Sequence, residues 1–210
     1  LFGKGLMETL EDFGSASPPP SHPELLDYLA IKFRTDWGWS PKRLLREIVS
    51  SATYRQSAVA DLDARAKDPR NVWLSRGPRT RLTGEMVRDN TLHVAGLLSA
   101  KMYGPPVMPV QPDGVWRSPY NKATWETSEG EDQYRRAVYT YWKRTVPYPS
   151  LLTFDAPSRD VCSSRRITTN TPLQALVTLN DPVYWECAQV LARAAEVEAG
   201  DAVDDQIGYA

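Results

Sequence analysis

The densest cluster of side chains capable of chemistry lies in residues 155–170 of this 210-residue chain. Guanidinium groups there could pair with carboxylates or anionic ligands through two parallel hydrogen bonds. A helix expected to begin near Pro172 adds free backbone N–H groups and a partial positive charge. The segment could therefore bind an acidic or sulfated polysaccharide. The candidate ligand-binding residues are Asp155, Arg159, Asp160, Arg165, Arg166, Thr169 and Asn170.

The same segment also fits an internal polar brace that binds no ligand. One of its carboxylates would then pair with one of its arginines, and the threonines and asparagine would hydrogen-bond loop backbone near the helix start. Adjacent residues of an extended segment point to opposite sides. We therefore expect one of Arg165 and Arg166 to turn inward to Asp155 or Asp160. The other should face solvent or a ligand.

Catalysis by this segment has less support than binding. Asp155 and Asp160 could form a carboxylate pair of the glycosidase kind, but acidic residues at this spacing are common. No G-x-S-x-G motif supports a serine nucleophile. We predict a non-catalytic structural or ligand-presenting domain. The alternative is a carbohydrate-binding or carbohydrate-active module that uses residues 155–170, with exposed tryptophans of residues 104–132 as a stacking platform.

Metal and haem binding are not expected of this chain. The two cysteines, Cys162 and Cys187, form no C-x-x-C motif, and the two histidines, His22 and His93, have no second ligand at metal spacing. Cys187 is expected on the inner face of a helix, where a small apolar thiol packs well. We expect both cysteines to be unpaired.

Charge and hydropathy limit the other partners. The formal net charge is −1, from 25 basic and 26 acidic residues, so no overall field attracts nucleic acid. Residues 135–144 do hold a local basic patch interleaved with tyrosines, but no nucleic-acid reader motif accompanies it. No stretch approaches the apolar length of a transmembrane helix. Neither nucleic acid nor a membrane span is expected.

The elements that must position the cluster are mainly α-helical. Hydrophobic residues make up 41% of the chain, which allows a substantial core. We expect one domain over residues 1–210, truncated at both ends, with long ordered loops rich in proline and aromatic residues and one or two short strands. Its parts are a helical hairpin at 21–56 (helices 23–34 and 41–53), a helix at 82–99, an irregular loop at 104–132, and the polar motif with C-terminal helices at 155–197.

Local signals predict where several helices begin. Ser21 with Glu24, and Thr171 with Gln174, have the spacing of a capping box, in which each side chain satisfies a free backbone N–H group. Asp181 is expected to cap the long helix that follows it. These signals place a helix start directly after the polar motif.

Hydrophobic spacing predicts which faces are buried. Val138, Thr140 and Trp142 alternate with polar and aromatic residues, which favours a strand. Gly84 weakens the helix expected at 82–99 by about 1 kcal/mol relative to alanine. The buried face of that helix is expected to consist of Leu82, Met86, Val87, Val94, Leu97 and Leu98.

Several long motifs together point to a known family. "SHPELLDYLA", "RLTGEMVRDNTL" and "FDAPSRDVCSSRRITTNTPLQALVTLNDP" occur in this order. They resemble the PSD-type C-terminal domain of unknown function in large exported proteins of planctomycetes and related bacteria. The resemblance implies a periplasmic or cell-surface location and partners among the other domains of the full-length protein. It also implies a cytochrome-c-like haem domain elsewhere in that protein, since this chain has no C-x-x-C-H.

Overall fold

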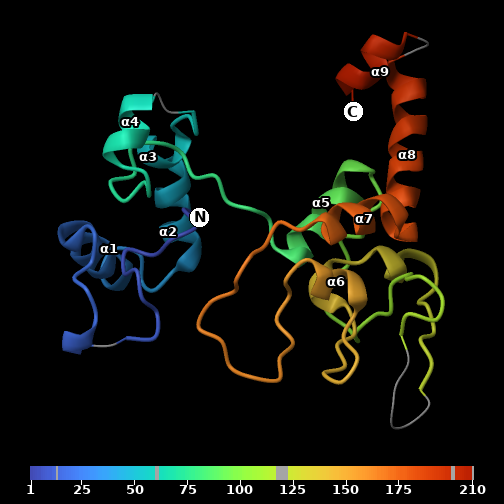
Figure 1. Ribbon diagram of the computed structural model, residues 1–210, viewed down its shortest axis with the longest axis horizontal. Coiled ribbons are helices and arrows are strands. Elements are labelled where there is room, and N and C mark those ends of the chain that lie inside the picture. Colours follow the sequence, from blue (N-terminus) through green and yellow to red (C-terminus); the bar gives the residue numbers. More distant parts are fainter. Residues whose placement is uncertain (13, 60–61, 117–122, 200–201, 210) are drawn as a thin grey trace. The chain divides into compact units, whose positions relative to one another are not determined.

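The computed structural model describes residues 1–210 except 13, 60–61, 117–122, 200–201 and 210 (Figure 1). The chain forms two compact units, Leu1–Arg81 and Leu82–Ala210. Among the described residues both units consist of helices and irregular loops, and backbone pairing outside helices is limited to isolated bridges. The prediction of a mainly α-helical chain is confirmed.

The first unit contains the expected helical hairpin, in which the first two long helices pack together. Its turn is closed by Trp39, whose N–H group donates to the Phe33 carbonyl at 2.8 Å and whose ring meets Phe33 edge-on. The helical elements of this unit are η1 (Gly14–Ala16), α1 (Pro23–Arg34), α2 (Pro41–Ser50), α3 (Ala52–Arg55) and α4 (Leu62–Lys67).

The start of α1 differs from the predicted capping box. His22, not Ser21, occupies the N-cap position, and no side chain caps the helix. The Ser21 hydroxyl lies 3.0 Å from His22 Nδ1 and is therefore engaged by the ring rather than by a helix N–H group. Pro23 still begins the helix, where its missing N–H group has no consequence.

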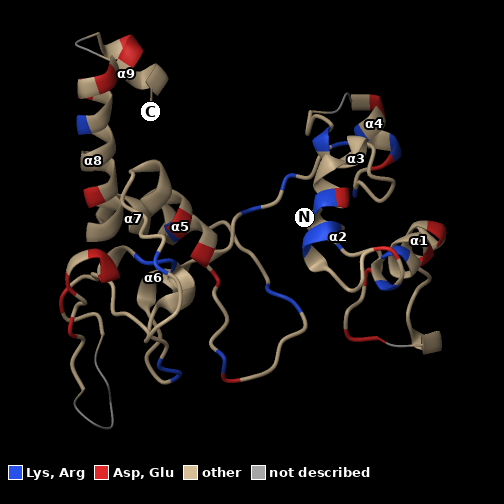
Figure 2. Ribbon diagram, turned by 180° about the vertical axis from the view of Figure 1, so that it is seen from behind, with Lys and Arg blue, Asp and Glu red and all other residues tan. Residues whose placement is uncertain are grey.

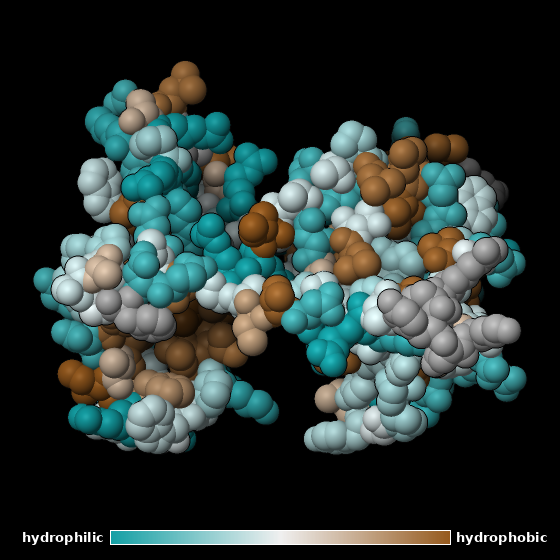
Figure 3. Space-filling model, turned by 60° about the horizontal axis from the view of Figure 1, so that its bottom comes forward, coloured by the Kyte–Doolittle hydropathy of each residue, from teal (hydrophilic) through white to brown (hydrophobic). Residues whose placement is uncertain are grey.

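Apolar side chains of the hairpin reach the surface. No residue of α1 or α2 is buried, and Leu25, Ile31 and Leu45 are 38%, 55% and 48% exposed. Brown apolar patches are visible on the molecular surface (Figure 3). Of the residues that the structure describes in this unit, the buried ones are Asp68 and Gly77.

The second unit is built around α5, which packs against η3, α6 and α8. Figure 1 shows α7 following the long loop that leaves α6, and α7 contacts both α6 and α8. The helical elements of this unit are α5 (Gly84–Val94), η2 (Gly130–Tyr134), η3 (Ala137–Tyr139), α6 (Pro149–Thr153), α7 (Pro172–Asn180), α8 (Pro182–Ala199) and α9 (Val203–Tyr209).

Two small apolar clusters form the core of the second unit. The first joins α5 to α8 through Leu92, Ala95, Val183 and Cys187. The second surrounds α6 and contains Ala137, Tyr148, Leu151 and Ala156, with Trp125 and Trp142 packed against it. The prediction that Cys187 lies on the inner face of its helix is thus confirmed.

Helix α5 ends earlier than predicted. Its last residue is Val94 rather than Ser99, because Gly96 adopts a left-handed backbone conformation at φ 72°. The N–H group of Leu97 then turns back to the Leu92 carbonyl at 2.8 Å, as is typical of a glycine-terminated helix.

The predicted buried face of residues 82–99 is wrong at Leu82, Met86 and Val94, whereas Leu97 and Leu98 are partly buried against the first core cluster. The buried residues of the helix are Gly84, Arg88 and Leu92. Gly84 decides this orientation, because an added Cβ atom would lie 3.0 Å from Phe154 Cβ and 3.2 Å from the Leu151 carbonyl oxygen of α6. The small residue faces the neighbouring helix, and the larger apolar residues turn outward: Leu82, Met86 and Val94 are 45%, 56% and 49% exposed.

The strand predicted through Val138, Thr140 and Trp142 is also wrong. Residues Ala137–Tyr139 form a 3-10 helix, and among the described residues the backbone bridge of this segment is to Val107. Val107 accepts from the Tyr141 N–H group at 2.7 Å and donates to the Tyr139 carbonyl at 2.8 Å. A single bridging residue satisfies the backbone here, so no second strand is needed.

Residues 104–132 form an ordered strap within their described part. Trp116 donates its indole N–H to the Val146 carbonyl at 2.7 Å, and Trp125 donates to the Pro109 carbonyl at 2.8 Å. Trp116 is only 7% exposed, so it holds the strap down and is not an open stacking platform. Tyr120 of the same loop lies outside the described residues. None of the helices in the described part of the chain combines the length and apolarity needed to cross a bilayer.

Candidate functional site

In the structure, the seven candidate residues of 155–170 fall into three groups: two that bond to each other near the start of α7, two that line a surface pocket, and three exposed residues that do neither. Asp155 and Thr169 bond to each other, and Arg159 and Arg166 line a pocket. The exposed remainder consists of Asp160, Arg165 and Asn170. The seven candidates therefore do not form one continuous site.

Asp155 and Thr169 seat the start of α7. Asp155 Oδ2 accepts from the Thr169 N–H group at 2.7 Å, and Asp155 Oδ1 accepts from the Thr169 hydroxyl at 2.9 Å. Gln174 donates through Nε2 to the Thr153 carbonyl at 2.8 Å and accepts the Thr171 N–H group through Oε1 at 2.9 Å. This part of the motif is a polar brace that joins α6 to α7. The carboxylate of the brace bonds to hydroxyl, amide and backbone groups.

Asp181 continues this local order into α8. One of its carboxylate oxygens accepts the Val183 N–H group at 3.0 Å, which confirms the predicted cap. The residue is buried, and its burial raises the pKa of the Asp181 carboxyl above the ordinary value. The starts of α7 and α8 are thus both stabilised by side chains that lie within a few residues of the helix start in the sequence.

Arg165 and Arg166 divide their roles as predicted, but the predicted partner is wrong. Arg166 Nη1 donates to Glu85 Oε2 at 2.6 Å, whereas Asp155 or Asp160 was expected. Arg165 is exposed and forms no ion pair with any residue that the structure describes. The pair is not buried either, since the side chains of Arg166 and Glu85 are 38% and 23% exposed.

The ion pair controls the charge of Glu85. Partial burial of this carboxyl raises its pKa, but the hydrogen bond and the positive charge of Arg166 outweigh the burial. The pKa of Glu85 therefore lies below its ordinary value, and the group is ionised at neutral pH.

A second arginine–carboxylate pair lies one helical turn further along α5. Arg136 Nε approaches Asp89 Oδ2 at 3.4 Å, and Asp89 Oδ1 accepts the Ala137 N–H group at 2.6 Å. Glu85 and Asp89 stand four positions apart and therefore project from the same face of the helix. This spacing was the sequence signal that could have drawn attention to α5.

These residues surround a surface pocket of about 330 Å³ in the second unit. Arg159 lies over the ring of Trp142, with its guanidinium carbon 4.9 Å from the ring centroid. Trp142 is fixed in turn by its indole N–H, which donates to the Ser158 carbonyl at 3.1 Å. The lining consists of Thr83, Glu85, Met86, Asp89, Arg136, Ala137, Val138, Thr140, Trp142, Leu151, Arg159 and Arg166.

Among the described residues that line the pocket, one positive charge has no carboxylate partner. Arg166 is neutralised by Glu85 and Arg136 by Asp89. Arg159 has no carboxylate within ion-pair distance among the described residues, and its contact is with Trp142. The pocket thus combines a free guanidinium group with polar and aromatic walls, which suits an anionic, hydroxyl-bearing ligand.

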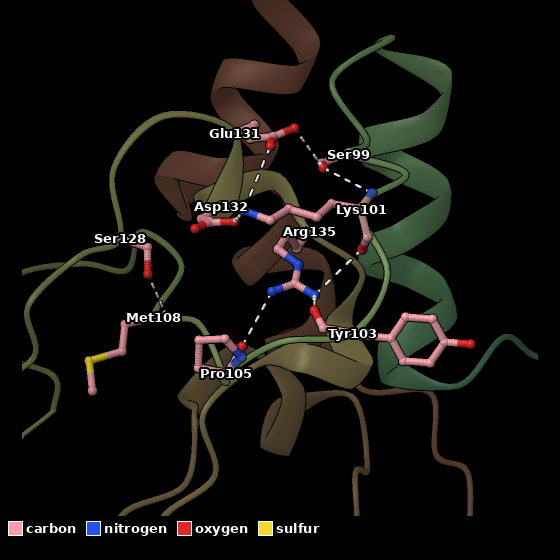
Figure 4. Close-up of polar contacts among 9 residues, drawn as sticks. All are labelled: Ser99, Lys101, Tyr103, Pro105, Met108, Ser128, Glu131, Asp132 and Arg135. Carbon is pink, nitrogen blue, oxygen red and sulfur yellow. Dashed lines mark hydrogen bonds and ion pairs between the residues drawn. The ribbon is translucent and has the colours of Figure 1, made fainter.

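The basic patch noted at residues 135–144 is not a continuous surface. Arg135 is 1% exposed and lies over the ring of Tyr139 at 3.9 Å. Figure 4 shows its guanidinium group turned into the loop before it, where it donates to the carbonyls of Tyr103 and of Pro105, the latter at 3.3 Å. Arg135 clamps this loop and is not available to a nucleic-acid backbone. Lys and Arg are interspersed with Asp and Glu along the ribbon of each unit (Figure 2).

The described residues offer no group of three or more histidine, cysteine, aspartate or glutamate side chains that could hold a metal ion. Cys162 is exposed and Cys187 is buried, and both are free thiols. Burial raises the pKa of the Cys187 thiol above its ordinary value.

Comparison with known proteins identifies the family. The family model of PSD1, described as "Protein of unknown function (DUF1553)", matches residues 1–210. The chain therefore belongs to the PSD1 family, as its motifs suggested. No curated protein and no solved structure matches the chain.

Proposed function

We propose that the second unit is a non-catalytic, ligand-presenting module of a larger exported protein, and that the arginine-lined pocket is its binding site. The observation that carries this proposal is the meeting of Arg159 and Arg166, from the polar motif, with two α5 carboxylates and Trp142 around one cavity. The resemblance to exported planctomycete proteins supports a periplasmic or cell-surface location. The expected partners are an acidic or sulfated polysaccharide and the other domains of that protein, including one that carries haem.

The state of the pocket carboxylates supports binding over glycoside hydrolysis. A glycosidase needs one carboxylic acid that stays protonated, which requires a raised pKa. Glu85 has a lowered pKa because Arg166 bonds to it. Asp155, the other candidate acid, is engaged by Thr169 in the brace at the start of α7. Arg166 thus holds Glu85 in its charged form, which suits binding better than the role of a general acid.

The lining supports an acidic sugar chain as the ligand. Guanidinium groups form strong, paired hydrogen bonds with carboxylates and other planar anions. Trp142 and Thr140 add an aromatic ring and a hydroxyl group to the same wall. A volume of about 330 Å³ falls within the usual size of small-molecule pockets. One or two sugar rings of a longer chain would fit such a space.

Titration calorimetry of the 210-residue chain with an oligogalacturonate, with dextran sulfate and with neutral dextran tests this proposal. We expect binding of an acidic glycan and none of dextran. Val138 lines the pocket and is 65% exposed, so Val138→Glu should place a repelling charge there without disturbing the fold. Affinity should fall at least about tenfold.

Val161→Glu is the matched control. Val161 is 76% exposed and does not line the pocket, so the same substitution there adds the same charge elsewhere. The control variant should bind as the native chain does. Failure of every acidic glycan to bind, or equal binding by the two variants, would refute the pocket as the ligand site.

A further inference from the structure

We infer that Arg159 determines specificity in this pocket by receiving a single carboxylate of the ligand, so that the ligand is a uronic-acid-type sugar. This inference rests on the proposed function and narrows it. Three features of the pocket support it: the pairing of the other arginines, the placement of Arg159, and an unsatisfied hydroxyl group.

The first feature is that the other two arginines are occupied. Arg166 is bonded to Glu85 at 2.6 Å, and Arg136 approaches Asp89 at 3.4 Å. A ligand anion that approached either of them would meet a carboxylate already in place. Like charges repel at such distances, most strongly where water is partly excluded. Arg159 is therefore the cation on which an incoming anion can settle.

The second feature is the backbone conformation and the ring contact of Arg159, which is an exposed residue. Its backbone has φ 64°, in the left-handed region that a residue with a Cβ atom rarely adopts. The guanidinium group rests over Trp142 at 4.9 Å. A guanidinium group supported on an aromatic face keeps N–H groups available for hydrogen bonds. Backbone outliers of this kind gather at functional sites.

The third feature is Thr140, which lines the same pocket. The residue is 7% exposed, and its hydroxyl group has no hydrogen-bond partner among the described residues. A buried hydroxyl left without a partner is unfavourable, and most such groups are satisfied in proteins. A ligand oxygen or hydroxyl in the pocket would supply the missing bond.

The charge count favours a carboxylate over a sulfate. One free guanidinium group balances one negative charge, and the planar carboxylate matches its fork of donors in a bidentate pair. Heavily sulfated chains present several charges close together and would need several free cations. The described lining of the pocket offers one, because Glu85 and Asp89 neutralise the other two arginines.

The test compares a free-acid oligogalacturonate with its methyl-esterified form, which lacks the negative charge, and with dextran sulfate. The native chain should bind the free acid at least about tenfold more tightly than either of the others. Arg159→Gln should abolish this preference, so that the ratio of the affinities for acid and ester approaches one. Arg159→Lys keeps the charge but loses the fork, and it should give an intermediate ratio.

Two further variants separate a specific role from a structural one. Thr140→Val keeps the side-chain shape and should weaken binding of the free acid about two- to tenfold. Arg165→Gln removes an exposed arginine from the same segment and should change the affinity less than about twofold. Circular dichroism and thermal melting should show that each variant is folded, because neither tested side chain belongs to an apolar cluster.

The outcomes distinguish this inference from the proposed function. Equal binding of acid and ester by the native chain would overturn the inference, as would an unchanged acid preference in Arg159→Gln. Tighter binding of dextran sulfate than of the free-acid oligogalacturonate would also overturn the inference, but the pocket would still be an anion-binding site. If neither acidic glycan binds at all, the proposed function fails together with the inference.

Discussion

Replacing Gly84 with alanine tests the packing that orients the candidate site. Gly84 is the first residue of α5, the helix that carries both pocket carboxylates. An added Cβ atom would lie 3.0 Å from Phe154 Cβ and 3.2 Å from each of the Leu151 and Phe154 carbonyl oxygens. Two of these three neighbours are backbone atoms, one in α6 and one in the residue that follows it, and they cannot move aside by changing a side-chain rotamer.

Two opposing effects set the size of the change. Alanine is a better helix former than glycine by up to about 1 kcal/mol, and less at a helix end. Overpacking a filled contact costs about 1–3 kcal/mol. The backbone neighbours place Gly84→Ala in the upper part of that range, so the free energy of unfolding should fall by about 1–2 kcal/mol. The melting temperature should drop by several degrees, about 2–8 °C per kcal/mol for domains of this size.

Chemical and thermal denaturation of the whole chain would measure this effect, with Gly208→Ala as the control. Gly208 lies in α9 with no atom within 4 Å of its added Cβ, and it has no positive φ. Its replacement should be neutral or slightly stabilising. If Gly84→Ala were as stable as the control variant, the close contact between α5 and α6 would not exist as described, and the orientation of the pocket carboxylates would lose its basis.

Two further predictions concern charged contacts. Arg166→Ala should lower the free energy of unfolding at neutral pH by about 0.5–1 kcal/mol, because the pair is half-exposed, whereas Arg165→Ala should change it by less than about 0.5 kcal/mol. Because the pKa of Glu85 is lowered in the folded state, its ionised carboxylate stabilises the fold at pH values above the unfolded pKa of this residue. In acid titrations monitored by fluorescence, this contribution should be lost as pH falls through the folded pKa of Glu85. If Arg166→Ala remains less stable than the native chain below that pH, the assignment of the Arg166–Glu85 ion pair is wrong. Tyr134 donates its hydroxyl to Glu186 at 2.7 Å, which raises the pKa of Tyr134 to about 12. Because the pKa is raised in the folded state, the Tyr134 hydroxyl stabilises the fold at pH values below its unfolded pKa near 10, and this stabilisation is lost as pH rises to about 12. The stability of Tyr134→Phe to denaturation should therefore depend less on pH between these values. An unchanged pH dependence would argue against the hydrogen bond between Tyr134 and Glu186.

Helix starts could be predicted because their causes are local. Pro23, Pro41 and Pro172 begin helices where the sequence placed them, and Asp181 caps α8. Proline at a first helical position and a polar side chain just before it act over three or four residues. Even here the Ser21 cap failed, because the neighbouring His22 ring engages its hydroxyl group.

The buried face of α5 could not be predicted, because it depends on a partner far away in the sequence. Hydrophobic spacing favoured Met86 and Val94, yet these face outward. The close fit of Gly84 against Phe154 rotates the helix, and the contact joins residues 70 positions apart. A glycine that seemed to weaken the helix is the residue that fixes its orientation.

Aromatic alternation misled the prediction for residues 138–142 for a similar reason. Residues of this type favour strands only where a second strand offers a continuous ladder of partners. Here individual side chains bond to separate partners: Tyr139 accepts the Tyr103 N–H group at 2.8 Å, and Trp142 donates to the Ser158 carbonyl at 3.1 Å. These partners are in loops, whose positions the sequence pattern does not reveal.

The sequence predicted that arginines of the site would pair with carboxylates, but it did not predict which carboxylate each arginine would meet. The arginines of residues 155–170 were expected to meet carboxylates close in sequence, Asp155 or Asp160. The structure instead brings Arg166 to Glu85, 81 positions away. In the structure, Thr169 and Gln174 bond to the oxygens of Asp155 at the start of α7. The sequence does not reveal that a glutamate of α5 lies within reach of Arg166.

The two Arg-Arg pairs of the chain explain how α5 frames the pocket. In each pair one member turns to α5: Arg136 to Asp89 and Arg166 to Glu85. Their neighbours point elsewhere, Arg135 into a buried loop clamp and Arg165 into solvent. Two carboxylates one helical turn apart therefore receive arginines from two different loops and hold both loops against the same helix. The remaining pocket arginine, Arg159, has no carboxylate partner among the described residues, because the described lining of the pocket contains no third carboxylate.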